Sequence, residues 1–347
     1  MATAAARRKE QEPKRSLSDV FNEFAKESVR QFPAAKGKLI IHDTNESATY
    51  GRDELNKKSP KTLSAVDAFV KRRAKDKDRQ TYADTSKSLK LFFILYDEPV
   101  NENHVKALPK KTEKEILYIL DHELAHLVIK DPPLEGETER YKQAIGEAIA
   151  DAYAMIRHYQ RYGTGSTHKS AIIDPWARAG ALTLNGDDVH FSTLMLEEII
   201  KRKDTIDFKA LDPQQTAELA RRFAVKYTPP SSVVNNFFNK MKPVQKIYDD
   251  EPDSNKWLKE LARITLDPKN DAITFTICKK ILDGYLDGRT DMDGRSYSTK
   301  GAYWDNIRDR LQKAEERHGR EDILFNIPQM KKKPRRKAAP KGPNAPE

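Results

Sequence analysis

The stretch Ile119–Val128, ILDHELAHLV, decides how the rest of the chain is interpreted. Apolar residues recur through it at helical spacing until the pair Pro132-Pro133, which a helix does not continue through. Two histidines and a glutamate are unusual in the middle of such a helix. Because residues four apart share one helical face, His122 and His126 can present two imidazole nitrogens to the same ion. The stretch therefore predicts a metal site on a helix.

The full pattern is H-E-x-x-H, in which Glu123 lies one residue round from the first histidine. There its carboxylate can take a proton from a metal-bound water instead of binding the ion. With eight histidines in the chain, a chance match has a probability on the order of 1%, so a third ligand is needed. A metzincin-type site requires glycine and histidine three and six places after His126. Ile129 and Pro132 occupy those places and exclude that type.

A candidate third ligand follows in GEAIADAY, residues Gly146–Tyr153. Glu147 and Asp151 are four apart on one helical face, beside an apolar stripe. HELAH at 122–126 and EAIAD at 147–151 together resemble the signature of the gluzincin, or thermolysin-like, zinc metallopeptidases. The resemblance covers only ~30 residues.

The resemblance implies that Glu147 is the third zinc ligand beside His122 and His126. It also implies that Asp151 accepts a hydrogen bond from the first histidine and fixes its tautomer. Two histidines, one glutamate and a water molecule make a catalytic Zn²⁺ arrangement, not a closed structural one. The expected activity is peptide hydrolysis with Glu123 as the general base.

The same resemblance implies a residue that stabilises the oxyanion, a histidine or tyrosine beyond the third ligand. Its local spacing is not matched, so we consider His190 in DDVHFST first and Tyr153 second. A capping or core histidine is the alternative role for His190. The strand LFFILY, residues 91–96, is expected to form the sheet edge on which zincins pair their substrates.

Other interpretations of these motifs stay open. HELAH can belong to a surface helix with a few polar residues. Glu147 and Asp151 can be exposed carboxylates that pair with Lys142 or Arg157. A zincin fold that binds no metal is a third alternative, because a fold does not imply its function.

Patterning along the chain predicts an α+β protein: a zincin-like catalytic domain with a small sheet and active-site helices, then a mostly α-helical domain. The expected domains are residues 16–205 and 206–327, flanked by disordered basic tails at 1–15 and 328–347. Capping boxes predict helix starts at Ser16, with Asp19, and at Thr112, with Glu115. The expected strands are Lys38–Asp43 and Lys90–Glu98, and the other expected helices are Ala65–Ala74, Glu139–Tyr162, Asp188–Lys203, Pro213–Tyr227, Ser232–Tyr248, Asn255–Ile264, Lys269–Leu286 and Lys300–His318.

The net charge of +10 resides at the chain ends. Seven Lys and Arg residues against one Glu give +6 in residues 331–347, and five against two acids give +3 in residues 1–15. Only +1 remains for everything between them, so a basic groove is not implied. The expected partner is a peptide or protein substrate, with nucleic acid contacted only through the tails. A nucleic-acid-associated regulator that uses a zincin fold as a scaffold, or cleaves one dedicated partner, is the alternative function.

Cys278 is the only cysteine, which excludes an internal disulfide and favours a reducing compartment. No apolar run approaches the ~18 residues of a membrane span, and no apolar stretch follows the N-terminal charges as in a signal peptide. We therefore expect a cytoplasmic protein without a membrane partner. Export by a non-classical route stays open, and the sequence indicates no oligomeric state.

Overall fold

The computed structural model describes residues 15–45, 48–73, 81–86, 90–97, 105–166, 174–186, 189–290 and 294–318. The two expected tails lie outside these residues, apart from Arg15. The helices are α1 (Leu17–Gln31), α2 (Arg52–Lys58), α3 (Pro60–Arg73), α5 (Lys110–Val128), α6 (Glu139–Tyr162), α7 (Pro175–Leu184), α8 (Thr193–Arg202), α9 (Pro213–Tyr227), α10 (Ser231–Asp250), α11 (Lys256–Thr265), α12 (Ala272–Leu286) and α13 (Ala302–His318), with short 3₁₀ turns η1 (Pro33–Ala35) and η2 (Phe208–Ala210). The strands are β1 (Leu39–Asp43), β2 (Thr49–Tyr50), β3 (Tyr82–Ser86) and β4 (Leu91–Tyr96). The expected α+β class is confirmed.

One of the two predicted capping boxes is present. The Ser16 hydroxyl accepts a hydrogen bond from the Asp19 backbone N–H at 3.1 Å, and the Asp19 carboxylate accepts one from the Ser16 backbone N–H at 3.0 Å. The box predicted at Thr112 is wrong, because α5 already begins at Lys110. Pro109 precedes that first turn with a φ of −59°, the value that its ring fixes and that suits helix entry.

The sheet has the strand order β2-β1-β4-β3. β1 and β4 run parallel, with Ile41 opposite Ile94, and both outer pairs are antiparallel. The expectation that LFFILY forms the sheet edge is therefore wrong, because β4 pairs on both sides. Its apolar side chains are buried on both faces, which suits a central strand. The edge strand that packs beside α5 is β3.

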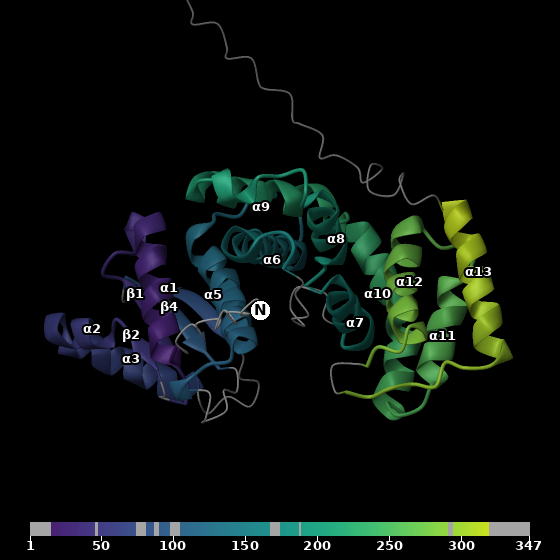
Figure 1. Cartoon of the computed structure of the whole chain (residues 1–347), viewed down its shortest axis with the longest axis horizontal. Helices are drawn as coiled ribbons and strands as arrows, with labels where there is room; N and C mark the ends of the chain where they lie inside the picture. The colour runs from purple at the N-terminus through teal and green to yellow at the C-terminus, as the bar shows by residue number, and fades with distance from the viewer. Residues whose placement is uncertain are drawn as a thin grey trace, which may run out of the picture.

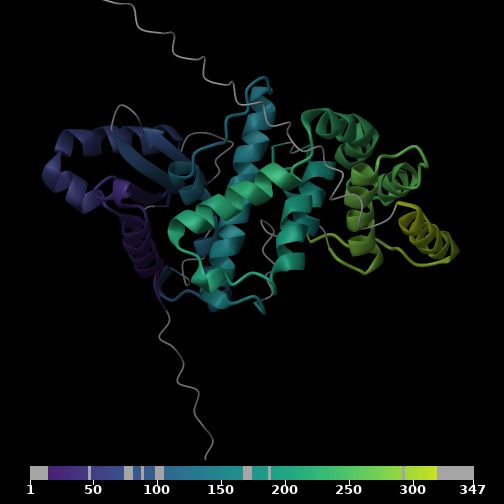
Figure 2. The same ribbon diagram turned by 90° about the horizontal axis from the view of Figure 1, so that it is seen from above.

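Helices cover both faces of this sheet. Alternate residues of β1 and β4, such as Ile41 and Ile94, pack with α1 and α5, and the intervening ones, such as Ile40 and Phe93, pack with α3. In Figures 1 and 2 this sheet unit lies at one end of an elongated molecule, and α10, α11, α12 and α13 lie at the other.

Two further hydrophobic clusters fill the rest of the molecule. One joins α5, α6, α8 and α9, and the other joins α7 with α10, α11, α12 and α13. The clusters meet at α8, which contributes Leu194 to one and Met195 to the other. The expected domain boundary after residue 205 stays a prediction, and α6, α7 and α8 form the middle of the molecule (Figure 1).

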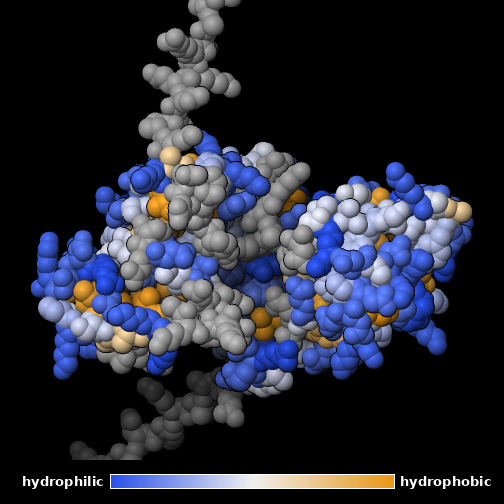
Figure 3. All heavy atoms as spheres, turned by 90° about the horizontal axis from the view of Figure 1, so that it is seen from below, coloured by the Kyte–Doolittle hydropathy of each residue, from blue (hydrophilic) through white to orange (hydrophobic). Residues whose placement is uncertain are grey.

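No helix in the described ranges is both long and apolar enough to span a bilayer. Figure 3 shows a mostly hydrophilic face with small, separate hydrophobic patches. Among the described residues, Tyr303 is the exposed large hydrophobic residue, with 48% of its surface accessible to solvent.

Candidate metal centre

The helix α5 presents both histidines of the H-E-x-x-H motif on one face. The Nε2 atoms of His122 and His126 lie 3.2 Å apart, and their ring centroids are separated by 4.9 Å. The opposite face carries Leu117, Leu120 and Leu124, which are buried against α1 and the sheet. The apolar face thus fixes the rotation of the helix and directs the imidazoles away from the sheet.

The neighbouring helix α6 brings Glu147 to the same point. Its Oε2 atom lies 3.1 Å from His122 Nε2 and 3.4 Å from His126 Nε2. Ligands bound tetrahedrally at zinc distances lie about 3.3 Å from one another. The three donor atoms therefore have the mutual spacing that one tetrahedral ion requires. Nitrogen and carboxylate donors suit zinc but also other transition metals.

His190 also lies at this cluster, but it is not part of a helix as the sequence had predicted. α8 begins at Thr193 and not near residue 188, so His190 lies ahead of the helix. Its Nε2 atom is 3.1 Å from Glu147 Oε2, and the ligand atoms of His122, Glu147 and His190 all fall within 4.8 Å of one another. The structure brings His190 to the site, while its role stays a prediction.

Asp151 lies behind His122, with 0% of its side chain exposed. Its Oδ1 atom is 2.9 Å from His122 Nδ1, the arrangement expected of a carboxylate that fixes the imidazole tautomer. Arg178 donates to the same oxygen at 2.6 Å, and the Ser192 hydroxyl donates to Oδ2 at 2.6 Å. Arg157 does not pair with Asp151, because its guanidinium contacts Glu27 instead.

Sequence reasoning missed Arg178 and Ser192 as parts of the site. No pattern predicted α7, the helix that carries Arg178, and neither residue belongs to a spaced motif. Both reach Asp151 only through the tertiary packing that brings α7 and the start of α8 to the middle of α6. The signal that could have found them is chemical, since a fully buried carboxylate needs hydrogen-bond donors or a cation.

Glu123 is buried, with 8% of the residue exposed. Burial raises the pKa of its carboxyl group, and the nearby histidines His122 and His126 oppose that increase. Within the described part of the chain, no hydrogen bond or ion pair engages this carboxylate. It is therefore available to exchange a proton.

The carboxylates make the cluster attractive to positive charge. Burial alone would lower the pKa of His122, but its hydrogen bonds to Asp151 and Glu147 raise it to about 10. Burial alone would raise the pKa of Glu147, but hydrogen bonds from His122, His126 and His190 lower it far below its usual range. A divalent cation would compete with a proton for the same His122 nitrogen.

Tyr153, the second candidate for oxyanion stabilisation, does not lie among these groups. It follows Asp151 by two residues, about 200° round the helix, so its side chain leaves the opposite face. The ring is fully buried and lies 6.4 Å from the ring of Phe32. Its expected catalytic role is therefore wrong, and it is a core residue.

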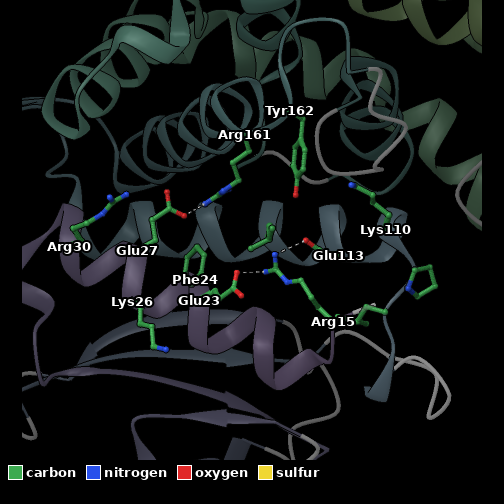
Figure 4. Close-up of a pocket in the computed structure, with 13 residues that line it drawn as sticks. Arg15, Glu23, Phe24, Lys26, Glu27, Arg30, Lys110, Glu113, Arg161 and Tyr162 are labelled. Atoms are coloured by element: carbon green, nitrogen blue, oxygen red, sulfur yellow. Dashed lines mark hydrogen bonds and ion pairs between the residues drawn. The ribbon is translucent and has the colours of Figure 1, made fainter. Parts of the chain in front are cut away.

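A separate pocket of about 1210 Å³ lies where α1 approaches the first turns of α5 and the end of α6 (Figure 4). Arg15 contacts Glu23 at 2.9 Å and Glu113 at 3.4 Å, and Arg161 contacts Glu27 at 3.4 Å. None of the metal-site residues lines this pocket. Its ion pairs connect α1 with the two helices that carry His122, His126 and Glu147.

No protein-family model matches the chain, and neither a curated protein nor a solved structure has significant similarity to it. The functional argument therefore depends on the site itself.

Proposed function

We propose that the chain is a zinc-dependent metallopeptidase of the gluzincin type. The observation that carries the proposal is the convergence of His122, His126 and Glu147 at the mutual spacing of tetrahedral ligands. Glu123 lies beside the first ligand on α5 and is unengaged within the described residues. Three ligands and a separate base are what a catalytic site needs, whereas a structural site closes its coordination with protein groups.

A zinc ion held by these three residues would polarise the scissile carbonyl group and acidify a water molecule beside it. Glu123 removes the proton from the attacking water and returns it to the leaving amine. Its buried environment raises the pKa of the carboxyl group, which makes the carboxylate a stronger base for the first transfer than an ordinary glutamate is. Asp151 holds His122 in the tautomer that presents Nε2 to the ion.

The substrate is a peptide segment in extended conformation. β3 is the outermost strand on the side of the sheet that packs beside α5. A peptide laid along an open strand edge gains main-chain hydrogen bonds whatever its side chains are. The imidazole of His190 is 24% exposed and lies 3.1 Å from Glu147, and in this proposal it donates a hydrogen bond to the carbonyl oxygen as negative charge develops.

The test is Glu123→Gln, with Glu115→Gln on the same helix as its matched control. Loss of the general base lowers kcat for a peptide substrate by about 10²–10⁴-fold while one zinc ion per chain is retained. Glu115→Gln keeps both activity and zinc. Zinc content is measured by atomic emission on purified protein, and hydrolysis is measured with a quenched fluorescent peptide library. Full peptidase activity in Glu123→Gln would refute the proposal.

The contact between His190 and Glu147 supports a second candidate, a closed site with four protein ligands. If His190 Nε2 also binds the ion, no coordination place remains for water and the metal has a structural role. The protein would then be a non-catalytic scaffold that binds its partner through the same fold. A regulator that contacts nucleic acid would do so through the tails, which lie outside the described residues.

A further inference from the structure

The carboxylate of Asp151 on α6 connects α5 with α7 and with the start of α8. Asp151 receives Arg178 from α7 and Ser192 from the start of α8, while it also holds His122 of α5. Asp151 and Ser192 are both fully buried. The same side chain thus connects a metal ligand to the wall of the site that carries His190.

Ser192 has an unusual use of its hydroxyl group. It occupies the N-cap position of α8, where a serine side chain ordinarily accepts a hydrogen bond from the first turn. Here the side chain makes no such bond. The hydroxyl is instead directed to Asp151 Oδ2 at 2.6 Å. The helix forgoes a stabilising cap so that this contact can form.

The contact bears directly on His190, two residues earlier. The Ser192 backbone N–H donates to the His190 carbonyl oxygen at 2.8 Å, which closes a tight turn. Phe191 between them is fully buried, and its ring lies 5.6 Å from that of Phe237. The turn therefore has one hydrophobic anchor on α10 and one polar anchor on Asp151, and the His190 imidazole projects from it to Glu147.

We propose that Ser192 is a positioning residue that sets the place of the His190 imidazole over the metal ligands. The proposal rests on the function proposed above, because it gives His190 a role in the reaction. Arg178 complements the buried negative charge of Asp151, so the carboxylate can accept the serine hydroxyl and the His122 N–H together.

The first test is a double-mutant cycle between Ser192→Ala and His190→Ala, with hydrolysis of one peptide as the readout. Ser192→Ala alone lowers kcat by about 10–100-fold, as loss of an outer hydrogen bond at a metal site commonly does. In the His190→Ala background the same change alters kcat by less than about twofold, since there is no imidazole left to misplace. Equal losses in both backgrounds, or no loss in the wild-type background, would overturn the proposal.

The matched control is Thr193→Val. Thr193 is adjacent, fully buried and β-branched like valine, and its hydroxyl has no hydrogen-bond partner in the described residues. Thr193→Val retains kcat, so a loss in Ser192→Ala alone is not a general effect of removing a buried hydroxyl at the start of α8.

A second measurement keeps the positioning claim separate from the peptidase claim. The imidazole resonances of His190, assigned by their absence in His190→Ala, are followed in the ¹H–¹⁵N spectrum of the full chain without added metal. Ser192→Ala shifts or broadens them and Thr193→Val does not. A wild-type chain that hydrolyses no peptide refutes the proposed function, whereas unchanged His190 resonances in Ser192→Ala refute the positioning role.

Discussion

The two candidate functions differ in the role that they give to His190. Its Nε2 atom lies as close to Glu147 as His122 does, 3.1 Å in each case. A histidine at this distance from a proposed ligand either binds the ion itself as the fourth ligand or lies beside a coordination position that stays open for water. The two roles differ in what the residue contributes to metal affinity.

We expect His190→Ala to reduce kcat by about 10²–10³-fold, the loss typical of one oxyanion donor, and to leave zinc affinity within about threefold. His126→Ala is the comparison, since removal of a true ligand lowers zinc affinity far more than removal of an outer partner, which costs 10–100-fold. Affinity is measured by competition with a chromophoric chelator. Equal losses of zinc affinity in the two variants would make His190 a ligand and favour the closed, non-catalytic site.

At the scale of whole elements, periodicity predicted the long helices because each has one apolar face. α1, α5, α6 and α9 were all expected, and the structure shows them. α7 was missed because it is almost entirely buried: Trp176, Ala177 and Ala179 leave no polar face to give a period. β3 was missed because YADTS has few bulky apolar residues, as suits an edge strand.

The residues of the candidate site also fall into two groups, those that could be predicted from their spacing in the sequence and those that could not. His122, His126, Glu147 and Asp151 could be predicted because each pair is four residues apart on one helix, and such spacing survives into the fold. Arg178 and Ser192 could not, because they reach Asp151 only through tertiary packing of α7 and α8. His190 was singled out, but its position ahead of α8 depends on the same packing.

α7 packs against α12, and the close contact between them is that of Trp176 on α7 with Gly284 on α12. A Cβ atom at Gly284 would overlap the Trp176 ring, whose Nε1–H donates to the Ile281 carbonyl oxygen at 3.3 Å. We expect Gly284→Ala to destabilise the protein by about 1–3 kcal/mol, the usual cost of overpacking. Because Arg178 follows Trp176 by two residues, zinc affinity should fall as well.

Gly180→Ala, within α7, is the matched control. No atom lies within 4 Å of the Cβ position there, so the change should stabilise the helix by about 0.5–1 kcal/mol. Both variants are compared by urea denaturation monitored by circular dichroism. If Gly284→Ala were as stable as the wild type, the packing of α12 on α7 would not constrain the site.

At the scale of the molecule, the site lies where separate hydrophobic clusters come together. α5 belongs both to the cluster with the sheet and to the cluster with α6, and the turn carrying His190 and Phe191 belongs to the cluster with α10. A metal ion at this point would join side chains that these clusters position independently. Binding the ion should therefore stabilise the chain as a whole and not one helix.

We expect zinc to raise the midpoint of thermal unfolding, and the rise grows with the logarithm of the ratio of free zinc to its dissociation constant. At a free concentration 100-fold above the dissociation constant, a ligand that binds only the folded state adds about 2.7 kcal/mol. Calorimetry of the metal-free protein titrated with zinc measures the shift, and Glu147→Gln, which weakens the site without removing bulk, should reduce it strongly.

Asp131→Asn is the control, because Asp131 is an exposed acid near His126 and Glu147 that makes no hydrogen bond with the described residues. A zinc-induced shift that survives Glu147→Gln unchanged would mean that zinc binds elsewhere, and would remove the basis for placing a metal between α5 and α6.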